Sequence, residues 1–137
     1  MTTASSAESQ FKSYKSVVSK DQIDLVPVLD IERCTKGHPM DKLSLQRHVK
    51  KWCKLCKQHY GVYPILYCSR EFYLKHFKEK FNSLLFWCGD VNATRSYVDK
   101  VNWTIWQYSI SLIPGIQGKV DVNQLHPDAS LETIKMK

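Results

Sequence analysis

Short runs of β-branched and aromatic residues alternate with helix-like segments along this chain, and this order constrains the fold more than any other feature. Four runs have the continuous apolar content of strands that are buried on both faces. They lie at residues 24–32, 62–68, 84–88 and 103–108. A short final strand is expected near 119–122, after a turn that contains Pro114 and Gly118. Strands separated by helices predict an α/β fold with mainly parallel pairing.

The segments between the strands carry helix signals. Apolar residues recur every three or four positions between about 41 and 60, and Gly61 stands where a helix C-terminus favours glycine. Ser69 is a good N-cap for a helix that continues through Phe81. A further helix is expected around residues 11–18, before the first strand. The order of elements is therefore helix, strand, helix, strand, helix, strand, loop, strand, turn and strand.

The length of 137 residues predicts a single domain over residues 1–137, because domains cluster at about 100–150 residues. A closed eight-unit β/α barrel needs about 200 residues or more, so the chain is too short for one. We expect a flexible start at residues 1–6 and a tail or short helix at 127–137. No apolar run approaches the ~18 residues of a membrane span, and no recognisable signal peptide opens the chain.

The net charge of +7 favours polyanionic surroundings, such as nucleic acid, an anionic cell wall or lipid head groups. Charge alone does not choose among them. The lysines gather on a helix beside a strand that ends in acids, and no zinc-finger, RNA-recognition or KH pattern is present. We therefore expect neither a nucleic acid nor a membrane as partner.

The chain has five cysteines, an odd number, which argues against a full disulfide framework. Cys53 and Cys56 form a CxxC pattern inside the helix expected at 41–60. A redox CxxC normally stands at a helix start, and a zinc site needs a second ligand pair that this region lacks. We interpret both thiols as buried helix residues, with metal or redox chemistry as the less favoured alternative, and predict no metal and no cofactor.

Asp30 and Glu32 stand at the end of the first expected strand. Residues two apart in a strand project from the same face, about 6.6 Å apart along it. Repulsion between two such carboxylates is one way in which enzymes keep one of them protonated near neutral pH. The carboxyl ends of strands in α/β folds are also where ligands bind. The pair predicts a catalytic site, with divalent-cation binding and a structural role as alternatives.

Aromatic and polar residues on the later strands form a second candidate site. Flat aromatic faces with polar rims suit sugar rings, although the same residues also pack in protein cores. The candidate residues are Tyr67, Trp87, Trp106, Gln107 and Tyr108. Alternation along a strand predicts that Trp106 and Tyr108 share one face while Trp103 takes the other. Asp121 and Asn123 repeat an alternating polar pattern on the last strand, which alone is a weak signal.

Taken in order, these segments resemble the C-terminal part of the glycoside hydrolase family 25 lysozymes, which are N-acetylmuramidases. The resemblance rests on LVPVLDIE (25–32), YPILYC (63–68), LLFWCGDV (84–91) and WTIWQYSISLIPGIQGKVDVNQL (103–125). It implies that Glu32 is the proton donor, that Asp30 is its partner carboxylate and that Asp121 is a further acid of the cleft. It also implies that Tyr67, Trp87 and Gln107 line a sugar-binding groove, with peptidoglycan as substrate.

The chain departs from that family at its beginning. Family members begin with a strand that bears an early Asp, and several strand and helix units precede the DxE strand. Only a helix precedes that strand here, so the resemblance implies a truncated, partial TIM-like β/α barrel with about five strands. The exposed edge of strand 24–32 predicts self-association. The resemblance also implies a location outside the cell or at the cell wall, and the alternative function is a catalytically inactive glycan-binding remnant.

Overall fold

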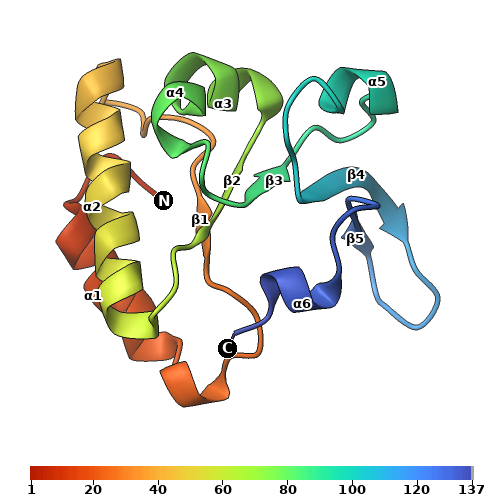
Figure 1. Ribbon diagram of the computed structural model, residues 1–137, viewed down its shortest axis with the longest axis horizontal. Coiled ribbons are helices and arrows are strands. Elements are labelled where there is room, and N and C mark those ends of the chain that lie inside the picture. Colours follow the sequence, from red (N-terminus) through yellow and green to blue (C-terminus); the bar gives the residue numbers. More distant parts are fainter. Residues whose placement is uncertain (137) are drawn as a thin grey trace.

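The computed structural model describes residues 1–136 and contains one five-stranded sheet (Figure 1). The strands are β1 (Val28–Asp30), β2 (Ile65–Cys68), β3 (Phe86–Cys88), β4 (Ile105–Leu112) and β5 (Lys119–Leu125). They lie in the order β1-β2-β3-β4-β5, and the first four are parallel. The predicted α/β class with about five mainly parallel strands is confirmed. The sheet is open, with β1 and β5 at its two edges.

The last strand pair is antiparallel, because residues 113–118 form only a short turn between β4 and β5. A parallel connection needs a crossover of a dozen residues or more, which this turn does not supply. The two strands form a hairpin that extends beyond the rest of the sheet (Figure 1). The hairpin carries Asp121 and Gln107 into the same part of the molecule as the carboxyl ends of the parallel strands.

Six α-helices and one 3-10 turn connect the strands within residues 1–136. They are α1 (Ala7–Val17), η1 (Lys20–Gln22), α2 (Lys42–Tyr60), α3 (Arg70–His76), α4 (Lys78–Phe81), α5 (Arg95–Val98) and α6 (Leu131–Ile134). The Asp41 side chain caps α2 by accepting from the Ser44 N–H, and Gly61 ends it at φ 82°. Ser69 caps α3 as predicted, but the helix expected to continue through Phe81 is interrupted at Phe77, between α3 and α4. Glycine suits the Gly61 position because it enters the left-handed region without steric cost.

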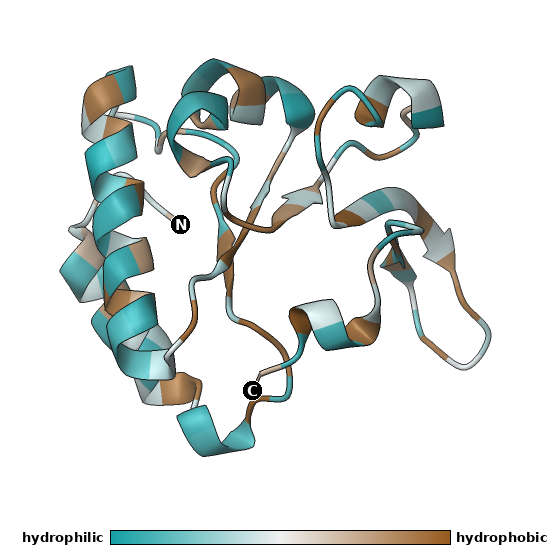
Figure 2. Cartoon of the chain, viewed as in Figure 1, coloured by the Kyte–Doolittle hydropathy of each residue, from teal (hydrophilic) through white to brown (hydrophobic). Residues whose placement is uncertain are grey.

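The two faces of the sheet are covered differently. The larger core lies on the side of α1 and α2, where Ile31, Leu66 and Phe86 pack against apolar residues of α2 such as Leu45 and Val49. Figure 2 shows the outward face of α2 to be largely hydrophilic. The opposite face of the sheet carries a smaller core. Its buried members are Val26, Ile65, Ile105 and Ile134.

Both ends of the described chain are held by hydrogen bonds. Thr3, at the start expected to be flexible, is 6% exposed and bonds reciprocally with Thr35. At the other end, the Val26 N–H donates to the Ile134 carbonyl, and the Met136 N–H donates to Asp24. The segment expected as a tail or short helix contains α6, which covers the smaller core.

Cys53 and Cys56 lie inside α2, as predicted, and both are buried. Burial raises the pKa of each thiol to about 12, so both are protonated at neutral pH. Within residues 1–136, no group of three or more His, Cys, Asp or Glu side chains is arranged to hold a metal ion. In the same part of the chain, no helix combines the length and the apolar character needed to cross a membrane.

Candidate active site

Asp30 and Glu32 lie on the same face at the carboxyl end of β1. Ile31, between them, is fully buried in the core on the helix side, so its two neighbours point to the other face. The Ile31 N–H donates to the Tyr67 carbonyl at 3.0 Å, which extends the pairing with β2 past the end of β1. Both acidic residues are exposed. Glu32 follows the end of β1 by two residues, and the burial of Ile31 between the two acids agrees with the predicted placement on one face.

Tyr67 is the centre of this face. It is aligned with Asp30 on one side and with Trp87 on the other in the parallel register. Its hydroxyl donates to Oε1 of Gln107 at 2.7 Å. Burial raises the pKa of Tyr67 to about 12, and further contributions come from the negative charges of Glu32, Asp30, Asp121 and Asp90, in that order. The carboxylates of Asp30, Glu32 and Asp121 therefore all contribute to the raised pKa of Tyr67.

Trp87 and Asn123 extend the same face towards the hairpin. The rings of Tyr67 and Trp87 meet edge to face, with centroids 5.5 Å apart. The Trp87 indole N–H donates to Oδ1 of Asn123 at 2.9 Å, and Asn123 is aligned with Gln107 across β4 and β5. Asp121 and Asn123 are two apart on β5 and share its face. Below, the term acidic face denotes Asp30, Glu32, Tyr67, Trp87, Gln107, Asp121 and Asn123.

Gly89 makes room for the Tyr67 ring. A Cβ atom at residue 89 would lie 2.7 Å from the Tyr67 hydroxyl oxygen and 2.8 Å from Cζ. Real side chains do not approach this closely, so any larger residue would push the ring away from its position. The glycine that follows β3 is thus a packing requirement of the acidic face.

Trp106 and Tyr108 are not brought together with the acidic face. Trp106 is 7% exposed in the core on the helix side, and its indole N–H donates to the Asp90 carbonyl at 3.0 Å. The Tyr108 ring lies 5.9 Å from that of Trp106. A register shift between Gln107 and Ser109 forms a bulge at Tyr108.

The placement predicted for Trp103 is wrong. Trp103 does not take the face opposite Trp106, because the two rings lie 6.1 Å apart in the same core. β4 begins only at Ile105, so Trp103 precedes the strand and its direction does not follow strand alternation.

The sequence reasoning did not identify Asp90, which follows the third strand. One carboxylate oxygen, Oδ2, accepts the Arg70 N–H at 2.6 Å and the Cys88 thiol at 3.1 Å. Asp90 thereby joins the start of α3 to the carboxyl end of β3. Its position two residues after β3, like that of Glu32 two residues after β1, was the available signal. Asn123 was noted in the sequence only as part of a weak pattern.

The family match and the similar solved structures indicate the same protein family. The sequence matches glycosyl hydrolases family 25 over residues 1–116. A search of curated proteins finds no significant match. Among solved structures, the chain is similar to a family 25 glycosyl hydrolase from Bacillus anthracis, with 26% identity and a TM-score of 0.78. That alignment covers 96% of this chain and 63% of the other.

Two further solved structures share the fold. A bacterial lysozyme from Streptomyces coelicolor has 21% identity and a TM-score of 0.74, over 96% of this chain and 65% of that one. A muramidase from Acremonium alcalophilum has 21% identity and a TM-score of 0.68, over 92% of this chain and 64% of that one. The chain thus spans less than two thirds of each of these relatives. The family match covers most of the chain and includes Asp30 and Glu32, so the chain belongs to glycosyl hydrolase family 25.

Proposed function

We propose that the chain is a muramidase-type glycoside hydrolase that cuts the bond between N-acetylmuramic acid and N-acetylglucosamine in peptidoglycan. The observation that carries this proposal is the convergence of Glu32, Asp30 and Asp121 on Tyr67, at the carboxyl ends of the strands of a family 25 chain. Glycoside hydrolysis uses a pair of carboxyl groups, and the partly exposed rings of Tyr67 and Trp87 on the same face suit contact with a sugar.

Glu32 is proposed as the proton donor. It would protonate the glycosidic oxygen as the bond to the anomeric carbon breaks, and water would then supply the hydroxyl group of the new sugar end. Asp30, on the same face, would take one of two roles. It would offset the positive charge that develops on the sugar, or it would orient the substrate's acetamido group as the internal nucleophile.

The remaining residues of the acidic face are proposed to bind sugar. Trp87 is half-buried and presents part of its ring beside Tyr67, as stacking against a sugar requires. The Gln107 Oε1 atom accepts the hydrogen bond from the Tyr67 hydroxyl. The two N–H donors on Nε2 of the same amide would donate to the sugar. Asp121 would accept hydrogen bonds from sugar hydroxyls. Trp106 is left out of this role because it packs in the core on the helix side, and Tyr108 is left out because its ring lies beside that of Trp106.

The proposed substrate implies a place of action at the cell wall, outside the cell. The net charge of +7 agrees with a polyanionic surface as surroundings. The named lysozyme and muramidase among the similar structures support the same substrate class.

The test uses purified cell walls and the Glu32→Gln variant. The parent chain should reduce the turbidity of the walls. Glu32→Gln should slow this loss about 10²–10⁴-fold, because general acids contribute about that much to the rate. Leu131→Gln, an exposed change away from the acidic face, is the matched control and should leave the rate unchanged. Wall binding with no turbidity loss would instead support the alternative, a glycan-binding chain without catalysis.

A further inference from the structure

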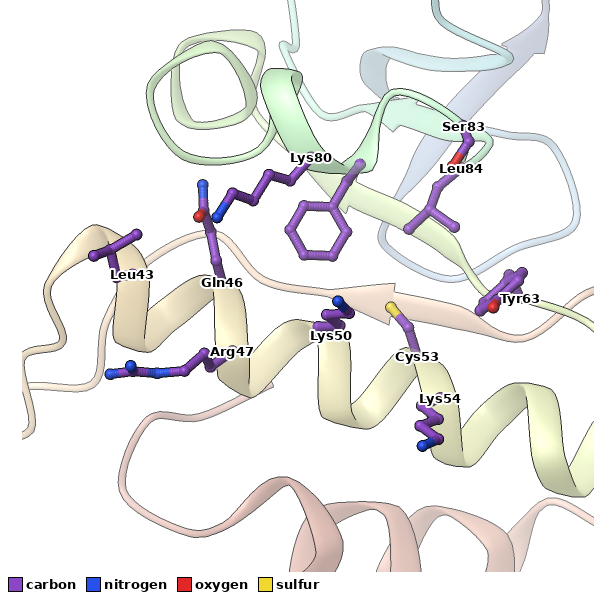
Figure 3. Close-up of a pocket in the computed structure, with 11 residues that line it drawn as sticks. Leu43, Gln46, Arg47, Lys50, Cys53, Lys54, Tyr63, Lys80, Ser83 and Leu84 are labelled. Atoms are coloured by element: carbon purple, nitrogen blue, oxygen red, sulfur yellow. The ribbon is translucent and has the colours of Figure 1, made fainter.

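A second site lies on the opposite side of the sheet, between α2 and the segment that runs from α4 to β3. It is a cavity of about 670 Å³ (Figure 3). Tyr63 precedes β2, and Ser83 and Leu84 precede β3, so the cavity is at the amino ends of these strands. The acidic face is at their carboxyl ends. The volume is within the 300–1,000 Å³ that is usual for small-molecule sites.

The charged residues that line this cavity are all positive. They are Arg47, Lys50, Lys54 and Lys80, and no Asp or Glu within residues 1–136 lines it with them. The ion pairs of the described residues do not involve any of these four side chains. Arg47 donates to the Ser44 hydroxyl at 3.0 Å, and that hydroxyl donates to Asp41 at 2.9 Å, so Lys50, Lys54 and Lys80 are the three cations without such a link to a carboxylate. Such a cluster attracts an anionic group, and phosphate is one that lysine and arginine bind well.

Gln46 places a buried hydrogen-bond acceptor, its Oε1 atom, at this cavity. Its Nε2 donates to the His76 carbonyl at 2.6 Å, which fixes Oε1 as the other end of the amide. The Gln46 side chain is 4% exposed, and its Oε1 accepts no hydrogen bond from the described part of the chain. A buried acceptor without a partner is unfavourable, because it has lost its hydrogen bonds to water. A ligand with a hydroxyl or amide N–H donor would remove this cost.

Figure 3 shows the side chains that surround the Gln46 amide. Gln46 projects from α2 towards Lys80, whose long side chain extends back over it from α4. Lys80 is exposed, so its rotation would open Oε1 to the cavity. Lys50 lies between Gln46 and Cys53 along α2. An anion held between Lys50 and Lys80 would therefore place an adjoining hydroxyl group near Oε1 of Gln46.

Apart from Gln46 and Ser83, most of the uncharged lining is apolar or aromatic. Phe81 and Leu84 form one wall, and Tyr63 and Leu43 are more than half exposed at the rim. Such walls suit the C–H faces of a ring rather than an ion alone. We propose that this cavity binds a phosphorylated sugar. The phosphate would pair with Lys50 and Lys80, a hydroxyl group would donate to Gln46, and the ring would contact Phe81 and Leu84.

A free sugar phosphate and a phosphorylated glycan polymer both carry a phosphate group on a sugar ring. Binding is therefore measured with one probe of each kind. Glucose 6-phosphate is the free probe and phosphomannan is the polymer. Glucose and inorganic phosphate are the controls, and binding is followed by calorimetry and by NMR shifts of the Gln46 side-chain amide. We expect glucose 6-phosphate to bind more tightly than inorganic phosphate, and glucose not to bind. Stronger binding of phosphomannan per phosphate would identify the polymer as the source, and weaker binding would identify the free sugar.

Two double-lysine variants test whether glucose 6-phosphate binds in this cavity. Lys50→Gln with Lys80→Gln should weaken glucose 6-phosphate binding tenfold or more, because two charge-assisted contacts are lost. Lys12→Gln with Lys15→Gln on α1 makes the same charge change outside the cavity and should have no comparable effect. Gln46→Leu should weaken glucose 6-phosphate but not inorganic phosphate.

Three results would overturn the proposal: no binding of glucose 6-phosphate at low salt, equal binding of inorganic phosphate, or equal losses in the two lysine pairs. The measurement is direct binding, so it does not depend on hydrolysis at the acidic face. Failure of the wall assay with the parent chain would leave these binding results unchanged.

Discussion

The Tyr67 hydroxyl donates a 2.7 Å hydrogen bond to Oε1 of Gln107, which joins β2 to β4 across the intervening strand β3. This bond spans the acidic face and needs the protonated phenol as donor. Burial and the surrounding carboxylates raise the pKa of Tyr67 to about 12, so the donor is retained over the whole physiological range.

The raised pKa of Tyr67 predicts a loss of stability in alkali. The folded-state pKa is above the ordinary value of 10, so the fold favours the protonated form. This contribution is fully present below about pH 10 and is lost as the pH rises through about 12. Urea unfolding between pH 9 and pH 12 should show a smaller decline for Tyr67→Phe than for the parent chain. Identical declines would show that Tyr67 does not carry the effect.

The close approach of Gly89 to Tyr67 predicts that Gly89→Ala destabilises the protein by about 1–3 kcal/mol, the usual cost of overpacking. The cause is steric, since the added Cβ would overlap the Tyr67 ring. Chemical denaturation measures the cost. In a Tyr67→Ala background the same substitution should cost much less, and an equal cost in both backgrounds would contradict this explanation.

Burial of the cysteines predicts a single reactive thiol. Cys53, Cys56 and Cys88 have pKa values raised to about 12, and Cys68 is fully buried. Only Cys34 is partly exposed. Ellman's reagent at pH 8 should therefore modify one thiol in the native protein and five after unfolding. Rapid native reaction of a Cys34→Ser variant would be the contrary result.

The outer edge of β1 predicts self-association, although the Met1 amino group donates to the Asp30 carbonyl there. β1 pairs only with β2, and a cavity of about 580 Å³ lies between its edge and α1. Sedimentation velocity should show the 16.0 kDa chain forming dimers as its concentration rises. Ser13→Arg, which adds a bulky cation to this cavity, should suppress dimers, whereas Ser16→Arg on the same helix should not. A monomer at all concentrations would be evidence against pairing through this edge.

Much of the fold could be predicted from the sequence because local signals dominate it. Asp41 and Gly61 bound α2, and the alternation of Asp30, Ile31 and Glu32 places both acids on one face. β1 is shorter than the apolar run 24–32, and only Val28–Asp30 form the strand. Pro27 stands just before it, where a missing donor does no harm.

The other differences depend on packing between distant residues. Trp103 precedes its strand, and the bulge at Tyr108 is set by pairing with β5, so alternation alone could not place them. The link from Asp90 to Arg70 joins residues that are separate in the sequence. The partner of the Tyr67 hydroxyl likewise comes from β4. No local pattern encodes such contacts.

The hairpin of β4 and β5 also bears on the order in which the chain assembles. Its strands are joined by residues 113–118, whereas β1 and β2 are separated by the whole of α2. Closing a short loop costs less entropy, so we expect the hairpin to form early and the β1–β2 pairing late. Pulsed hydrogen exchange during refolding should protect the Ile110 amide before that of Leu29, and the reverse order would refute this. Asp30 and Glu32 would then join Asp121 only in the final stage of refolding, so the proposed catalytic arrangement would be a late product of the folding pathway.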